Sequence, residues 1–276
     1  MKKVLLATSA LTLSAGFASA DVSMSGTGGA GVFGANGADL SVYSGVDLGF
    51  SLSGASDSGM TFSAALDMGG GQTLDVGDFE LATQDMGADD NVAVTIGVSG
   101  LTIDLCQDGV DDLYDSDIAA DIGISGAMGD LTYSVDTGLE DADPTSLSIG
   151  NSAGAISGSV ATSDEGDAST VTVTYAMGDI TVSAESDTDR AGADTSSVTV
   201  SYAMADGMSV SLENSEDVNT LSVSYASGAV SVAVEADDAD DESWEATMAY
   251  DLGGGATFNL GTNDDETTFA GVGFSF

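Results

Sequence analysis

The sequence contains no histidine, and only 3 of its 276 residues are lysine or arginine. Without histidine, Ser-His-Asp triads and the usual zinc sites are excluded. No lysine follows Lys3, which excludes a phosphate-loop lysine and Schiff-base chemistry in the rest of the chain. The chain carries 46 aspartates and glutamates, and phosphate contacts need Lys and Arg. We therefore expect neither an enzyme nor a partner of nucleic acids.

Proline, cysteine and long apolar runs are also scarce. Pro144 and Cys106 are the only residues of their kinds, so no internal disulfide is possible. No run after the first twenty residues reaches the roughly 18 apolar residues that a membrane-spanning helix needs. Glycine, in contrast, occurs 37 times. Abundant glycine with almost no proline is typical of many tight turns between uninterrupted strands.

The first twenty residues have the three parts of a secretory signal peptide. Lys2 and Lys3 form a positive start, residues 4–17 are mainly apolar, and Ala18-Ser19-Ala20 fits a cleavage site. We therefore expect a signal peptide over residues 1–20 and a single mature domain over residues 21–276. Arg190 then remains as the one basic residue against 46 acidic ones, a net charge of −45. Divalent cations are the obvious compensating partners.

A hairpin unit repeats about every 25 residues in the second half of the chain, as expected of an array of similar hairpins. Each unit has one strand, a tight turn, a second strand and an acidic loop. The first strands lie in 171–178, 198–205, 221–228 and 244–250. The second strands are predicted at 180–186, 208–214, 230–236 and 256–262.

Within these strands, Val, Leu and Met alternate with Thr, Ser and Glu, which assigns them to two faces. Tyr175, Tyr202, Tyr225 and Tyr250 precede the short turns at corresponding positions. Four tyrosines at one level predict an aromatic girdle at a membrane interface. The alternative is that each tyrosine caps the core of a β-sandwich.

The first half of the chain is less regular but compatible with the same architecture. Strands are predicted at 22–33, 40–52, 60–68, 92–98, 101–106, 118–125, 131–136, 146–150 and 155–161. With nine in the second half, the direct count is eighteen, and sixteen is equally acceptable. Residues 70–91 are predicted to be a long loop, within which 73–81 is an alternative short strand.

In the last ten residues, apolar side chains alternate with serine and glycine up to the terminal Phe276. Phe269 is the exception, an apolar residue on the polar side. No segment supplies a second layer to cover the apolar face. A closed antiparallel β-barrel in a membrane solves this problem, because every backbone group pairs and the apolar face meets lipid. The terminal strand should then pair with the strand at 22–33 and leave no edge.

The same alternation predicts an acidic pore. Glu185, Glu213 and Glu235 end the second strands of successive hairpins and should form an arc near the loop-side mouth, where their charge attracts cations. For any single residue, the alternative is ordinary solvation of a polar face. The residues predicted to face inward are Asp47, Asp67, Asp104, Asp136, Glu185, Glu213, Glu235, Glu245 and Asp251.

A resemblance to a known family lies in segments 51–62, 97–102, 107–114 and 250–256 and in the terminal Phe276. In these parts the chain resembles the α-proteobacterial general porins, typified by Rhodobacter porin. The resemblance implies a sixteen-stranded trimeric barrel in the outer membrane, surrounded by lipid, with short periplasmic turns. It also implies that the outer-membrane assembly machinery reads the C-terminal aromatic residue. The family's third extracellular loop folds inward, and its acidic residues face a basic cluster on the wall.

The start of that loop matches residues 107–117, and its candidate constriction residues are Asp108, Asp111, Asp112, Asp115 and Asp117. The chain departs from the family in two ways, because the loop is shorter and the basic cluster is missing. The resemblance therefore implies passive diffusion of small hydrophilic solutes and, given the acidic lining, of cations.

A secreted acidic β-repeat protein, binding calcium at a surface or in adhesion, is the alternative. Such a protein needs no continuous outward apolar band. No cofactor is expected in either case, although loose calcium binding at Asp237-Asp238 and Asp240–Glu242 is compatible with both.

Overall fold

The computed structural model describes residues 17–84, 92–111, 113–114, 119–139, 145–163, 168–189, 191–216, 218–239 and 243–276. No helix among these residues is long and apolar enough to cross a membrane. They form strands and one short 3-10 turn at Ala205–Gly207. The strands are β1 (Phe17–Gly34), β2 (Ser41–Ser56), β3 (Thr61–Asp75), β4 (Glu80–Gln84), β5 (Val94–Val98), β6 (Leu101–Asp111), β7 (Ala119–Met128), β8 (Leu131–Thr137), β9 (Thr145–Ala153), β10 (Ile156–Ser163), β11 (Ser169–Met177), β12 (Ile180–Thr188), β13 (Asp194–Ala203), β14 (Met208–Ser215), β15 (Val218–Ser227), β16 (Val230–Asp237), β17 (Trp244–Gly253), β18 (Ala256–Asn263) and β19 (Thr268–Ser275).

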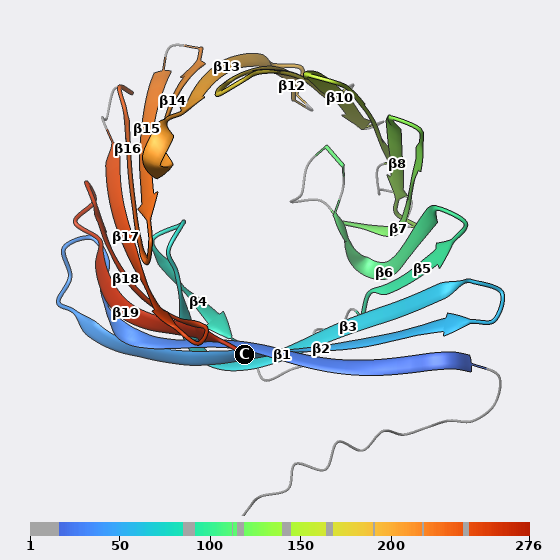
Figure 1. The fold of residues 1–276 in the computed structure, drawn as a ribbon, viewed down its shortest axis with the longest axis horizontal. Coiled ribbons are helices and arrows are strands. Elements are labelled where there is room, and N and C mark those ends of the chain that lie inside the picture. The colour runs from blue at the N-terminus through green and yellow to red at the C-terminus, as the bar shows by residue number, and fades with distance from the viewer. Residues whose placement is uncertain are drawn as a thin grey trace, which may run out of the picture.

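Among the described residues, eighteen of these strands close a ring of antiparallel neighbours (Figure 1). Each pairs with its neighbour along the chain, except that β3 pairs with β5 and the ring closes where β19 pairs with β1. The remaining strand, β4, pairs with the end of β3. The predicted all-β closed barrel and the direct count of eighteen strands are thus confirmed, whereas the family's sixteen does not hold for this chain.

The closing seam joins β19 to β1, as predicted. The N–H of Gly26 donates to the carbonyl of Phe276 at 3.0 Å, and the N–H of Phe276 donates back to Gly26 at 3.0 Å. On β1, a Cβ atom at Gly26 would lie 2.5 Å from the ring of Phe276, and one at Gly28 would lie 2.7 Å from the ring of Phe274. These glycines therefore leave room for the two terminal rings.

Strand β1 begins inside the predicted signal peptide. Phe17, Ser19 and Ala20 pair with the end of β2, and the regular ladder continues from Asp21, which pairs with Ser53. A chain cut after Ala20 would therefore lose only the first pairs of this ladder and keep the whole seam with β19.

The outer face carries a continuous apolar band. Val173, Val200 and Leu212 are between 44 and 50 % exposed, although they lie in the middle of paired strands. A contiguous apolar surface of this extent is not stable in water and is suited to lipid. The four predicted girdle tyrosines are 40–44 % exposed at corresponding positions near the short turns; they are Tyr175, Tyr202, Tyr225 and Tyr250.

The predicted long loop over residues 70–91 is wrong in part. Strand β3 continues to Asp75 and forms a hairpin with β4, and Figure 1 shows β4 inside the ring. The hairpin leaves the wall at Gly71, which has a φ of 81° and is the last residue of β3 paired with β2, opposite Gly45. A Cβ atom at Gly45 would lie 2.5 Å from the backbone of Gln72, so the chain crosses the inner face of β2 there. Only glycine permits so close a passage.

An aromatic cluster holds this hairpin against the wall. Phe79 of the hairpin packs on Phe269 of β19 with ring centroids 5.3 Å apart at 61°, an edge-to-face arrangement. Phe33 of β1 and Tyr43 of β2 complete the cluster, and all four residues are between 1 and 9 % exposed. The cluster explains why Phe269 breaks the alternation of the last strand, because its ring is needed on the inner face.

We predict that Phe269→Ala lowers the free energy of unfolding by about 3–5 kcal/mol, because it empties a filled site next to three other aromatic rings. Urea unfolding of the detergent-solubilised barrel measures this loss. Phe258→Ala is the matched control, since Phe258 is only half-buried and pairs with Tyr250 and Val272 of the outer band. An equal loss for both variants would contradict the anchoring role of the cluster.

Candidate functional site: the barrel lumen

The inner face is identified by the hairpin. Because β4 lies inside the ring and Phe79 packs on Phe269, the residues that share the parity of Phe269 face inward. Residues that are directly paired across two strands lie on the same face of the sheet, so the inner face can be followed from strand to strand. Phe269 is paired with Gly261 of β18, and Gly261 is paired with Thr247 of β17. The inner face so defined is rich in Ser, Thr, Gly, Asp and Glu.

Three glutamates occupy the same place in three successive hairpins, and each lies opposite a hydroxyl of the preceding strand. In every case the hydroxyl donates a hydrogen bond to the carboxylate. The pairs are Thr172–Glu185 at 3.1 Å, Thr199–Glu213 at 3.1 Å and Ser222–Glu235 at 2.5 Å. The register thus brings the predicted arc together, and we call these three residues the glutamate arc. Its hydrogen bonds orient each carboxylate along the wall.

The arc stops at the fourth hairpin, where the aromatic cluster begins. There Thr247 is opposite Gly261 instead of a glutamate. A Cβ atom at Gly261 would lie 2.4 Å from the ring of Phe269. The ring that anchors the inward hairpin therefore occupies the position that the next carboxylate of the arc would have.

The acidic lining continues from Glu235, the last residue of the arc, toward the inward hairpin. Glu235 and Glu245 are directly opposite each other on β16 and β17, and Glu245 interacts electrostatically with both Glu235 and Asp78. Asp78 belongs to the turn of the inward hairpin, where the Oδ1 atom of Asp75 accepts its N–H at 3.3 Å. Like charges directly opposite in a sheet repel, so this group favours bound cations.

The other predicted lining residues are spread around the wall. Asp47 of β2 is half-buried, and Asp67 of β3 is exposed. Asp104 of β6 accepts a hydrogen bond of 2.5 Å from the hydroxyl of Thr95. Asp251 lies at the other end of the barrel, where its carboxylate accepts the N–H of Gly253 at 2.7 Å in the turn after β17. Asp251 is therefore distant along its strand from Glu245 and the arc.

The third loop reaches the inner wall through its described residues. The N–H of Leu113 donates to the hydroxyl of Ser146 at 3.0 Å, and Ser146 is fully buried on β9. The hydroxyl of Tyr114 lies 2.9 Å from the carbonyl of Thr188 and 3.3 Å from the carboxylate of Asp187. Because these partners belong to β9 and β12, Leu113 and Tyr114 lie on the lumen side of the wall.

The five aspartates predicted for this loop are not described at the side-chain level. Asp108 and Asp111 belong to β6, whose register with β7 shifts between Leu105 and Val110. Asp112, Asp115 and Asp117 lie outside the described residues, as does Arg190. Their assignment to the constriction stays a prediction.

Asp187 and Asp78 are inner carboxylates that the sequence pattern does not assign to the lumen. Asp187 was assigned to a loop, yet β12 extends to Thr188 and Asp187 is paired with Thr170, whose hydroxyl donates to it. Its spacing of two residues from Glu185 is the signal that identifies it. Asp78 has no such signal, because only the inward fold of the hairpin brings it near Glu245.

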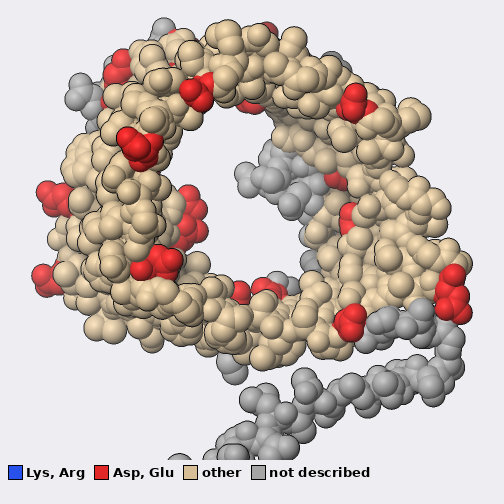
Figure 2. Space-filling view, in the orientation of Figure 1, with Lys and Arg blue, Asp and Glu red and all other residues tan. Residues whose placement is uncertain are grey.

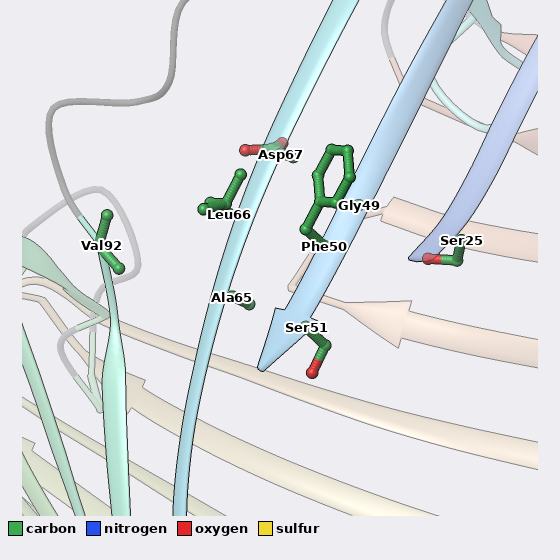
Figure 3. A pocket seen from close by; sticks show the side chains of 8 residues that line it. All are labelled: Ser25, Gly49, Phe50, Ser51, Ala65, Leu66, Asp67 and Val92. Atoms are coloured by element: carbon green, nitrogen blue, oxygen red, sulfur yellow. The ribbon is translucent and has the colours of Figure 1, made fainter. Parts of the chain in front are cut away.

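A cavity of about 270 Å³ lies where β3 changes partner (Figure 3). The last pair of β3 with β5 is Ala64–Val94, and its first pair with β4 is Gly71–Gln84. The cavity occupies the interval between them, and its walls come from β1, β2, β3 and the residue two before β5. They are Ser25, Gly49, Phe50, Ser51, Ala65, Leu66, Asp67 and Val92.

The carboxylates proposed for loose calcium binding already have protein donors. Asp237 accepts the N–H of Ala239 at 3.0 Å and the hydroxyl of Ser243. Asp238 accepts the backbone N–H of Asn219 at 2.6 Å and its side-chain amide at 2.9 Å. These two bonds to the charged form hold the pKa of Asp238 below its usual value of 3.8. The described part of the chain contains no group of three or more His, Cys, Asp or Glu placed to hold a metal ion.

All charged side chains among the described residues are negative. Figure 2 shows acidic side chains on the rim and on the inside of the opening, and the described part of the chain includes no lysine or arginine. A ring of strands with an apolar exterior, a polar interior and two segments folded inward defines the class of transmembrane β-barrel channels.

Comparison with known proteins gives the family. The sequence profile of the Gram-negative porins matches residues 7–274, so the chain belongs to this family. The protein is accordingly an outer-membrane porin, and both family and fold point to a channel rather than an enzyme. No characterised protein sequence matches the chain.

Solved structures of engineered variants of the Rhodopseudomonas blastica porin share the fold. Two of them are 16 % and 17 % identical in sequence, each covers 93 % of this chain and 100 % of its own, and each superposes with a TM-score of 0.59. A third is 16 % identical over the same shares, with a TM-score of 0.60. At this identity the likeness establishes the fold alone.

We predict that Tyr114→Phe loosens the third loop, because it removes the hydroxyl that contacts Asp187 and Thr188. A lost hydrogen bond of this kind costs about 0.5–1.5 kcal/mol. The rate of chymotrypsin cleavage after residue 114 in the assembled barrel should rise. Tyr133→Phe is the control, since Tyr133 belongs to the outer band opposite Ile149. Unchanged cleavage in Tyr114→Phe would contradict the anchoring of this loop.

Proposed function

We propose that this porin is a cation-selective channel for the passive diffusion of small hydrophilic solutes and ions. The observation that carries the proposal is the glutamate arc, whose three carboxylates are oriented by hydroxyls of the wall. No basic side chain among the described residues opposes it. The family resemblance would imply a transverse electric field between acidic and basic residues. The described residues of this chain supply the acidic side chains and none of the basic ones.

The magnitude of the repulsion supports cation binding in the lumen. Two like charges about 4 Å apart cost about 4 kcal/mol at an effective dielectric of 20. Glu235 and Glu245, directly opposite each other, therefore favour a counter-cation between them. The same field disfavours small anions, and salt screens it because the Debye length falls to about 3 Å at 1 M.

Further parts of the proposal concern maturation and assembly. We propose that residues 1–20 are removed, so that N-terminal sequencing of the purified protein should begin at Asp21. We also propose a homotrimer, which chemical cross-linking in the membrane would test. The secreted calcium-binding alternative is disfavoured by the continuous apolar band of the outer face, and cell fractionation separates the two.

We predict that changing Glu185, Glu213 and Glu235 together to Gln lowers the cation-to-anion permeability ratio toward one. The glutamines keep the size and hydrogen-bonding capacity of the side chains while removing three charges from the lumen. The ratio is measured as a reversal potential across a planar bilayer in dilute neutral salt.

The matched control removes three charges from the exposed short turns, as Asp57→Asn, Asp130→Asn and Asp179→Asn. This control should leave the ratio close to that of the parent protein. Anion preference in the parent protein, or an equal effect of both triple variants, would refute the role of the glutamate arc.

We predict that deletion of Phe276 lowers the yield of assembled barrel without affecting synthesis or export. The deletion removes both backbone hydrogen bonds to Gly26 at the closing seam, each worth about 0.5–1.5 kcal/mol, together with the terminal aromatic proposed to be read by the assembly machinery. Heat-modifiable mobility of outer-membrane fractions measures assembly. Phe276→Tyr keeps the aromatic ring and should assemble normally, and normal assembly after the deletion would disprove this prediction.

A further inference from the structure

The inward hairpin of β3 and β4 is a built element of the lumen, separate from the third loop. The third loop contacts β9 and β12, whereas the hairpin packs on β1, β2 and β19. The two segments therefore come from different parts of the wall. The third loop is the constriction that the resemblance implies, and nothing in the resemblance accounts for the hairpin.

The backbone is shaped to bring the hairpin inside. Gly71 adopts a left-handed conformation, and a Cβ atom there would lie 2.2 Å from the carbonyl oxygen of Ser44. Gly45 lies below the backbone of Gln72, at 2.5 Å from a Cβ position. An alanine at Gly45 would thus collide with backbone atoms that cannot rotate away, and only a displacement of the hairpin relieves the collision.

The hairpin is closed by side-chain hydrogen bonds and is strained at its tip. The side chain of Gln84 donates to the hydroxyl of Thr73 at 2.8 Å across the two strands. Asp75 accepts the N–H of Gly77 at 3.0 Å and closes the turn. Phe79 has a φ of 54°, which is a rare conformation for a bulky residue. Such strain persists where the surrounding structure over-determines it, and here the aromatic cluster does so.

The tip lies next to the carboxylates of the wall. Phe79 packs on Phe269, and the ring of Phe269 covers Gly261 at the place where the glutamate arc would continue. The neighbouring Asp78 interacts electrostatically with Glu245, which is opposite Glu235. The hairpin therefore adds Asp78 to the charged lining on the lumen side of the wall.

From this arrangement we infer that the β3–β4 hairpin is a second, permanently inserted constriction, in which Phe79 is the positioning residue that holds Asp78 near Glu245. The inference rests on the proposed channel function for its effect on ions. The position of the hairpin does not depend on that function and is tested separately.

The structural test compares two alanine variants of the same strand. Gly45→Ala should expel the hairpin, whereas Gly49→Ala should not. Gly49 has the same inward parity on β2, and a Cβ atom there meets only the hydroxyl of Ser25 at 3.2 Å. Chymotrypsin is added to the assembled, heat-modifiable barrel, and mass spectrometry records cleavage after Phe79, which is 7 % exposed. We expect protection in the parent and in Gly49→Ala, and loss of protection in Gly45→Ala.

The conductance test uses the same proteins in planar bilayers. Gly45→Ala and Phe79→Ala should have a larger single-channel conductance and a lower cation preference than the parent, because the hairpin and Asp78 leave the path. Gly49→Ala and the volume-keeping Phe79→Leu should stay close to the parent. Phe79 lies outside the paired strands of the wall. Phe79→Ala therefore still tests whether the hairpin constricts the pore if Gly45→Ala fails to assemble.

The outcomes separate the two hypotheses. Cleavage after Phe79 in the parent as fast as in Gly45→Ala, or a conductance of Phe79→Ala equal to that of Phe79→Leu, would overturn the inserted constriction. A parent protein that inserts into bilayers without conducting would instead refute the channel function, and the protease result would still decide where the hairpin lies.

Discussion

Closure of the ring is the constraint on which every other feature depends. A strand in the apolar part of a membrane cannot leave its N–H and C=O groups unpaired, since each unsatisfied group costs several kcal/mol. The barrel meets this condition by pairing β19 with β1 and by ending the chain on a residue whose backbone bonds to Gly26. Once the ring is closed, the two-residue period of the strands sends alternate side chains to lipid and to the lumen.

Glycine has two opposite uses on these two faces. On the outer face, Gly26 and Gly28 leave space for the rings of Phe276 and Phe274, so that the seam is covered by aromatic surface. On the inner face, Gly45 and Gly71 allow a strand to leave the wall and cross it at close range. Glycine thus makes room for aromatic rings on the outer face and for the backbone of the hairpin on the inner face.

The lumen combines an orderly and an irregular acidic lining. The glutamate arc repeats because the hairpin repeats, and each carboxylate accepts a hydrogen bond from a hydroxyl of the preceding strand. The irregular part is built by segments that fold inward, with Tyr114 bound to β12 on one side and Phe79 packed on β19 on the other. Oppositely placed inward segments narrow the space in which the negative field acts, and this strengthens its effect on passing ions.

The sequence by itself determined the barrel, the positions of its strands, the seam and the inward parity of Glu185, Glu213 and Glu235. Each of these follows from the two-residue period and the hairpin repeat, which are local properties. It left the strand number open between sixteen and eighteen, predicted residues 70–91 as a loop with 73–81 as an alternative short strand, and left Phe269 unexplained. Only the tertiary structure decided these points, because the path of the β3–β4 hairpin depends on contacts between Phe79 and Phe269, 190 positions apart in the chain. Alternation predicts the face on which a side chain lies, whereas the packing of the hairpin on the inner wall depends on which distant segments the closed ring brings together.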